Sequence, residues 1–220
     1  MNGLVIDPAL TLADHEQMAK YKENYFTPEL IIPPEITYTW YLSNPQAFIA
    51  ARDMQTGQIV GHLNYFPFRN EMLTEFFSGK LDGSVFSVSY LKQNPNIIRR
   101  YDSPGEYYLY LSSVAVAPQY SHTNLFRMLV NAYGEVLLQL AKREMYISFL
   151  VANAVTRQGI KLGNYFHMRS GIISVPQYDI YISTALTDFL KCMKKSLRTE
   201  LSAAYKNFTS GYDQKMLIQD

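Results

Sequence analysis

The stretch from Tyr107 to Gly163 constrains the fold of this chain more than any other part. Its pattern predicts, in chain order, a strand over 108–116, a polar turn over 121–124, a helix over 125–143, a strand over 145–152 and a helix ending at 161–163. Where a strand leads into a polar turn and then a helix, the first backbone N–H groups of the helix are unpaired and the helix dipole points at the turn. We therefore expect the turn to bind an anion, and the whole unit to bind a phosphate-bearing cofactor.

The rest of the chain alternates short helices and strands, which indicates an α/β fold. The predicted elements are a strand over 4–6, a helix from 11 or 14 to 25, a helix over 34–42, a hairpin of strands over 48–53 and 59–66, and an antiparallel pair over 171–175 and 179–183. The pattern weakens over 67–106, apart from a helix expected over 71–78. Because a structureless loop of that length is unusual, we interpret 67–106 as an insertion over one face of the core.

An amphipathic helix is predicted close to the end of the chain, over 186–208. Its apolar stripe consists of Leu186, Phe189, Leu190, Met193, Leu197, Leu201, Tyr205 and Phe208. This stripe must be covered either by the chain's own sheet, which we favour, or by the same stripe of a second copy, so a homodimer stays open. We accordingly divide the chain into a domain over 1–185 and a C-terminal helix and tail over 186–220.

Charge and cysteine content narrow the class of partner and compartment. With 20 Lys and Arg against 19 Asp and Glu, the net charge of +1 gives no reason to expect a nucleic acid or an acidic membrane as partner. Cys192 is the single cysteine, so there is no internal disulfide, and a reducing compartment is indicated. The first residues do not resemble a signal peptide, and no apolar run approaches the roughly 20 residues that cross a bilayer. We expect a cytoplasmic protein.

Three local sequences, in their order along the chain, resemble the GNAT superfamily of acyl-coenzyme A-dependent N-acetyltransferases. Ile49–Asp53 with Thr56–Gly61 is similar to the second and third strands of that family, and Ser113–Pro118 to its fourth strand and the exit that follows. Ser148–Asn153 with Lys161–Gly163 resembles the fifth strand and the end of the next helix. The resemblance implies a mixed, mostly antiparallel sheet flanked by helices, with an insertion before the fourth strand and an extra C-terminal helix.

The resemblance, which spans residues 4–183 except the insertion over 67–106, also implies an activity. An acetyl or similar acyl group would pass from acyl-coenzyme A to a primary amine by direct attack in a ternary complex. Acetyl-coenzyme A is the implied co-substrate, and a small-molecule or peptide amine is the acceptor, which we expect the insertion to select. No metal is predicted, because His15, His62 and His167 have no ligand-like spacing.

The resemblance assigns ten residues to the cofactor: Val114, Ala115, Val116, Ser121, His122, Thr123, Asn124, Leu125, Phe126 and Asn153. The backbone of the first three would pair with the pantetheine arm, and the amides of the next six would hold the pyrophosphate. Asn153 would hydrogen-bond the cofactor or an ordered water. His122, when protonated, would partly replace the basic residue that the family has in the turn, and Asn124 would accept the positive φ usual for a glycine there.

Two residues are the candidates for proton transfer, which acyl transfer to an amine requires. Glu106, just before the strand over 108–116, is the only nearby carboxylate besides Asp102, although a solvated charge is the commoner role for a carboxylate at such a position. Gly159 occupies the position of the family's acid Tyr, so Tyr165 is the candidate substitute.

The acceptor is expected to lie against one face of the strand over 108–116. Tyr108, Tyr110 and Ser112 alternate along that face, and phenols can bind a polar substrate while they form an apolar wall. Packing of these tyrosines under the insertion is the alternative. Cys192, among apolar residues and without a nearby His or Asp, is expected to be a buried structural thiol.

A second function, from a different class, stays open on these residues. The turn over 121–124 lacks the glycines of the family pattern, and no Tyr stands at position 159. These departures favour a non-catalytic GNAT-like module that binds an acyl-coenzyme A or a protein partner. The strand over 108–116, its exit at Pro118 and the helix that follows favour the enzyme.

Overall fold

One mixed sheet of 7 strands organises the molecule, in the order β1-β2-β3-β4-β5-β7-β6. The computed structural model describes residues 3–26, 28, 31–69, 71–72, 88–94, 97–154, 156–175, 178–182 and 186–208. The strands are β1 (Leu4–Asp7), β2 (Phe48–Asp53), β3 (Ile59–Phe68), β4 (Gly105–Val116), β5 (Met145–Ala154), β6 (Arg169–Val175) and β7 (Tyr178–Ile182). Neighbouring strands pair antiparallel, except for the parallel pair of β4 and β5. The predicted fold class, a mostly antiparallel mixed sheet flanked by helices, is confirmed.

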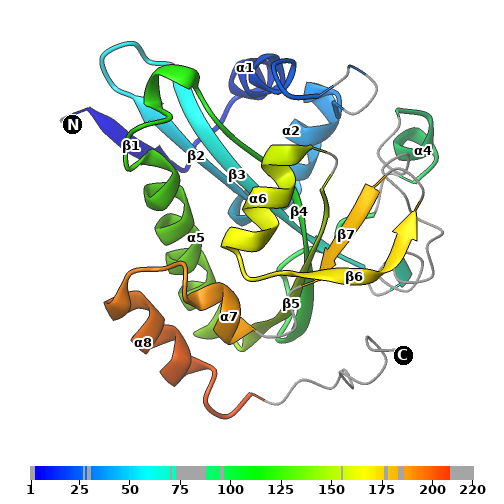
Figure 1. The fold of residues 1–220 in the computed structure, drawn as a ribbon, viewed down its shortest axis with the longest axis vertical. Coiled ribbons are helices and arrows are strands. Elements are labelled where there is room, and N and C mark those ends of the chain that lie inside the picture. Colours follow the sequence, from blue (N-terminus) through cyan, green and yellow to red (C-terminus); the bar gives the residue numbers. More distant parts are fainter. Residues whose placement is uncertain are drawn as a thin grey trace.

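The helices lie on both faces of this sheet. They are α1 (Leu12–Lys22), α2 (Pro34–Ser43), α4 (Val88–Gln93), α5 (Leu125–Ala141), α6 (Arg157–Tyr165), α7 (Leu186–Leu190) and α8 (Lys195–Ala204). Figure 1 shows α1 and α2 together at the top of the view and α7 and α8 beside the lower end of α5. Short 3₁₀ helices over Pro45–Ala47 and Pro118–Tyr120 lead into β2 and out of β4.

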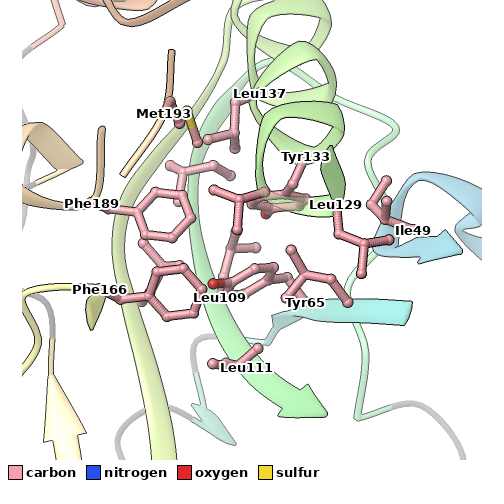
Figure 2. Close-up of a cluster of buried hydrophobic side chains, with 14 of the residues drawn as sticks. Ile49, Tyr65, Leu109, Leu111, Leu129, Tyr133, Leu137, Phe166, Phe189 and Met193 are labelled. Atoms are coloured by element: carbon pink, nitrogen blue, oxygen red, sulfur yellow. The ribbon is translucent and has the colours of Figure 1, made fainter. Parts of the chain in front are cut away.

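Each face of the sheet buries its own cluster of side chains. On the α5 face, the ring of Tyr65 stacks on that of Tyr133 at 4.3 Å between centroids, and Phe189 closes on both (Figure 2). On the α1–α2 face, Trp40 packs edge-on against Phe66 at 4.9 Å. Because aromatic side chains bury large areas, these two clusters account for much of the stability of the sheet.

Helix α1 is fixed to the edge of the sheet by charges as well as by packing. Thr11 and Asp14, the two alternative starts that the sequence predicted for this helix, together form the capping box of α1. The guanidinium of Arg52 on β2 contacts Asp14 at 2.9 Å and Asp7 on β1 at 2.6 Å. These hydrogen bonds and this charge hold the pKa of Asp14 below its usual value, although burial opposes the shift. The N-terminal end of α1 is therefore fixed to the sheet. This also positions its C-terminal residue, Lys22, which lines the site described below.

The C-terminal segment is two helices, so the prediction of one helix over 186–208 is wrong. The chain leaves α7 at Leu190 and turns at 191–194, where the backbone N–H of Lys194 donates to Asn131 Oδ1 on α5 at 2.8 Å. The turn lets both Phe189 and Leu197 reach the core. The apolar stripe packs within the same chain, but α8 lies on α5 and α7 contacts β5, whereas we expected the sheet to cover the whole stripe.

A glycine makes this docking possible. A Cβ at Gly134 of α5 would lie 2.6 Å from Met193 Sδ and closer still to Leu197 Cδ2. A larger residue therefore fits there only if the side chains of Leu197 and Met193 shift. The cost of a glycine within a helix is thus offset by close contact between α5 and α8.

The 67–106 segment is described only in part. Strand β3 runs on to Phe68, which pairs with Ile98, and β4 begins at Gly105, three residues earlier than predicted. The helix predicted over 71–78 lies outside the described residues beyond 72, and α4 was not predicted. In the described part of the chain, no helix combines the length and apolarity needed to cross a membrane.

Candidate functional site

A cleft of about 640 Å³ opens where β4 and β5 separate. Residues 110–116 of β4 and 152–154 of β5 form its floor, and α6 and the segment that follows α1 form its sides. Six of the predicted cofactor residues meet here: Val114, Ala115, Val116, Ser121, Phe126 and Asn153. The other four are not among the described residues that line the cleft: His122, Thr123, Asn124 and Leu125. A concave site of this volume is in the range that holds a small molecule or the end of a cofactor.

The separation of the two strands follows from their pairing. Parallel pairing of β4 with β5 extends from Gly105 to Tyr110, while residues 151–154 of β5 pair with β7 instead. Among the described residues, no pairing of 111–116 with β5 is found. The edge of β4 that faces away from β3 is therefore open to the cleft, and its backbone groups must be satisfied by water or a ligand.

The turn between β4 and α5 carries unpaired amides. Thr123 Oγ1 donates to the carbonyl of Tyr120 at 2.6 Å and accepts from the N–H of Leu125 at 3.2 Å, which fixes the start of α5. Among the hydrogen bonds of the described residues, none uses the backbone N–H of His122, Asn124, Phe126 or Arg127. Four free donors at the beginning of a 17-residue helix are the arrangement that binds a phosphate.

Asn124 adopts φ −78° and ψ 9°, so the expectation of a positive φ at this position is wrong. The hydroxyls of Ser121 and Thr123 hold the turn, because they donate to the carbonyls of Pro118 and Tyr120. The turn therefore forms without a glycine. Tyr120 ties the turn to the hairpin, because its hydroxyl donates to the carboxylate of Asp53. This hydrogen bond holds the pKa of Asp53 below its usual value.

Asn153 has an unsatisfied oxygen at the cleft. Asn153 lies on β5 and lines the cleft, and its Oδ1 is buried without a hydrogen-bond partner in the described structure. A buried amide oxygen without a donor is uncommon in a folded protein. A free acceptor at this place is what the predicted role of Asn153 requires, a hydrogen bond to the cofactor or to an ordered water, and that role stays a prediction.

Tyr165 lines the cleft as the last residue of α6. Its ring packs edge-on against Phe126 at 5.1 Å, and its hydroxyl donates to the carbonyl of Cys192 at 3.5 Å. Burial raises the pKa of Tyr165, so the phenol keeps its proton at neutral pH. Phe126 lines the cleft beside it and fills the position of a small residue in the family pattern.

Glu106 is not among the described residues that line the cleft. It lies near the beginning of β4, beside Tyr146 of β5, and its carboxylate accepts a hydrogen bond from the hydroxyl of Ser148. The backbone carbonyl of Glu106 accepts from Arg99 at 2.7 Å. The structure therefore does not bring Glu106 together with Tyr165, the other predicted catalytic residue.

The predicted acceptor face of β4 is interrupted by a bulge. Asn64 of β3 pairs with Ser113, and the next residue, Tyr65, pairs with Leu111, so Ser112 is an extra residue. As a result Ser113, rather than Ser112, continues the face of Tyr108 and Tyr110 and accepts a hydrogen bond from Asn64 at 3.3 Å.

Two members of that predicted set still meet the cleft. Tyr110 and Ser112 line it, whereas Tyr108 is buried in the cluster on the α1–α2 face. Burial raises the pKa of Tyr110, which keeps its phenol protonated. The sequence did not indicate this bulge. Its neighbours, Leu111 and Ser113, are an apolar and a small residue, and either can occupy either face of the strand.

Lys22 is a cleft residue that sequence reasoning missed. It ends α1 and is only 7% exposed, and burial lowers its pKa from the usual 10.5 to about 8. Two buried histidines, His15 and His62, are close enough that the charge of Lys22 lowers their pKa values further. A lysine in the last turn of a helix usually lies in solvent, so no sequence signal marked this one.

No group of three or more His, Cys, Asp or Glu side chains that could hold a metal ion is found in the part of the chain that the structure describes. Cys192 is a half-buried free thiol, whose Sγ donates to the carbonyl of Tyr165. Burial raises the pKa of Cys192 to about 11, which leaves the thiol protonated and unreactive at neutral pH.

No protein-family profile matches this chain, and no curated protein does. Its structure is similar to those of Ard1 from Thermoplasma volcanium (11% identity, 82% of this chain and 95% of that chain, TM-score 0.47) and of a putative acetyltransferase of the GNAT family from Desulfovibrio desulfuricans (15%, 82% and 98%, 0.48). It is also similar to yncA, a putative acetyltransferase from Salmonella typhimurium, with its cofactor acetyl-CoA (12%, 82% and 92%, 0.45). The resemblance to GNAT chains that the sequence indicated is found again in solved structures, and at these identities it concerns the fold alone.

Proposed function

We propose that this protein is an N-acyltransferase, which moves an acetyl or similar acyl group from acyl-coenzyme A to a primary amine by direct attack in a ternary complex. The observation that carries the proposal is a cleft lined both by the open edge of β4 and by Phe126, whose unpaired backbone N–H stands at the start of α5. An extended amide-bearing arm with a pyrophosphate at one end matches both features. We further propose a reducing cytoplasmic setting, in keeping with the free thiol of Cys192.

Each part of the cleft has a proposed task. The amides of residues 122, 124, 126 and 127 bind the pyrophosphate, and 114–116 pair with the pantetheine arm, whose amide N–H is held by Asn153 Oδ1. In the reaction the amine forms a C–N bond with the thioester carbonyl, the C–S bond breaks, and the amine's proton is lost as the thiolate gains one. Tyr165 is the proposed donor of the proton that the thiolate gains, because its phenol stays protonated beside the cleft.

The role of Glu106 as the proton acceptor stays a prediction. Its carboxylate lies outside the described lining of the cleft, so it can act only through intervening groups. The absence of any carboxylate from the described lining favours a second candidate, a non-catalytic module that binds an acyl-coenzyme A. The two candidates share the cofactor site and differ in turnover.

The test is a calorimetric titration of the purified protein with acetyl-coenzyme A, and with coenzyme A and ATP as controls. We expect micromolar binding that is selective for the two coenzyme A compounds. No binding up to millimolar concentration would refute both candidates. Where binding is found, an amine screen separates them, and Tyr165→Phe is expected to lower kcat on any accepted amine by about tenfold or more while acetyl-coenzyme A affinity is kept.

A further inference from the structure

The charge of Lys22 has no partner in the described structure. Its side chain lines the cleft, and among the described hydrogen bonds and ion pairs none involves its Nζ. At neutral pH the amine is still mostly protonated, because burial lowers its pKa only to about 8. A buried cation without a counter-ion is rare in folded proteins, and an anion supplied by a ligand would remove the penalty.

The residues around Lys22 do not supply that anion. His62 is fully buried with no hydrogen-bond partner for either ring nitrogen among the described residues, and Nε2 of His15 also has none. The carboxylate that acts on His15, Asp14, is already bound by Arg52 and by Thr11. Neither histidine is among the described residues that line the cleft, so Lys22 is the member of this group that offers donors and positive charge there.

The charged side chains that line the cleft are also positive. Among its described lining residues the charged side chains are Lys22 and Lys161, and there is no carboxylate to bind an acceptor's ammonium group. An acceptor that carried only an amine would be repelled by Lys22 before it lost its proton. An acceptor that carries a carboxylate as well would pair with Lys22 and present its amine to the thioester.

We propose that Lys22 binds a carboxylate on the acceptor, so that the acceptor is an amino acid or another small amine that bears a carboxylate. The inference rests on the proposed acyl transfer and names the substrate class of the same cleft. A coenzyme A phosphate is the other source of an anion. The unpaired amides at the start of α5 already provide for the pyrophosphate, so the carboxylate is the better match for the lysine at the end of α1.

The test compares amino acids with the amines that they give on loss of the carboxylate: L-phenylalanine with phenethylamine, and L-leucine with isoamylamine. In the parent we expect kcat/KM to favour the amino acid of each pair by about tenfold or more. Lys22→Met should remove this preference, whereas Lys20→Met, the same substitution at an exposed position of α1, should keep it. A missing preference, or one that survives Lys22→Met, overturns the inference.

Binding measurements separate the possible failures. If acetyl-coenzyme A binds the parent and Lys22→Met alike but no carboxylate preference is found, the inference fails and the proposed function stands. If Lys22→Met weakens acetyl-coenzyme A and leaves the preference intact, Lys22 faces a phosphate, and 3′-dephospho-coenzyme A then shows whether it is the 3′-phosphate. If acetyl-coenzyme A does not bind the parent, the proposed function fails and the inference with it.

Where no amine of either pair is turned over, binding of 3-phenylpropionate decides. Calorimetry should detect it in the parent, and its affinity should fall by about tenfold or more in Lys22→Met. Absence of binding to the parent, or equal binding to the variant, overturns the inference. The thermal midpoint of Lys22→Met shows whether that variant is folded.

Discussion

Replacement of Lys22 by Met should stabilise the ligand-free protein at neutral pH, and the gain should shrink as the pH rises. The folded state holds the lysine's proton only up to a pKa of about 8, whereas the unfolded chain holds it up to the usual 10.5. At 1.36 kcal/mol per pKa unit, the charged lysine therefore costs the folded state about 3 kcal/mol at pH 7. Between the two pKa values unfolding takes up a proton, so the parent gains stability as the pH rises through this window.

The assay is urea unfolding of the parent, Lys22→Met and Lys20→Met at pH 7 and pH 10. We expect the free energy of unfolding of Lys22→Met to exceed that of the parent by an amount that falls by about 2.5 kcal/mol between these pH values. His15 and His62 titrate below this window, and the buried tyrosines with raised pKa values are common to all three proteins. A difference between Lys22→Met and the parent that does not change with pH would refute the reasoning, as would an equal change in Lys20→Met.

Three further variants test the site and the core. Asn124→Pro fits the observed φ of −78° but removes one free amide, so calorimetry should show acetyl-coenzyme A bound about tenfold more weakly, and unchanged affinity would remove the turn as the phosphate site. Asn153→Leu should weaken acetyl-coenzyme A by a similar factor without loss of thermal stability, because its Oδ1 has no partner to lose; full affinity would contradict its assigned role. Gly134→Ala should lower the melting temperature by about 2–4 °C, because overpacking against Leu197 outweighs the better helix propensity of Ala, and a variant as stable as the parent would disprove the close docking of α8.

The strands and helices of the β4–α6 region could be predicted because local patterns decide them. The apolar run over 108–116 and the periodic run over 125–143 can each form only one kind of element, and the structure has β4 and α5 there. The start of α1 at Thr11, one of the two predicted positions, is equally local. Where a segment's conformation depends on its own residues, the prediction is confirmed.

Features set by distant contacts could not be predicted in this way. The break after α7 depends on Asn131 and Gly134 of α5, which are far away in sequence from Lys194. The bulge at Ser112 depends on how β3 pairs with β4. Lys22 looks like any lysine in a last helical turn, and only the fold places it over the cleft. The sequence therefore indicated several residues that line the cleft, among them Tyr110 and Ser112, and missed Lys22.

The place of β7 between β5 and β6 has a consequence for folding of the chain during its synthesis on the ribosome. Strand β6 is made before β7, and its one partner among the described strands is β7. The edge of β5 over 151–154 also pairs with β7. A nascent chain that has released residue 175 therefore exposes two unpaired strand edges at once, both of which are templates for mispairing with other chains. Synthesis of seven more residues, through Ile182, closes both edges together. A pause in translation within that short interval would prolong the exposure of both edges.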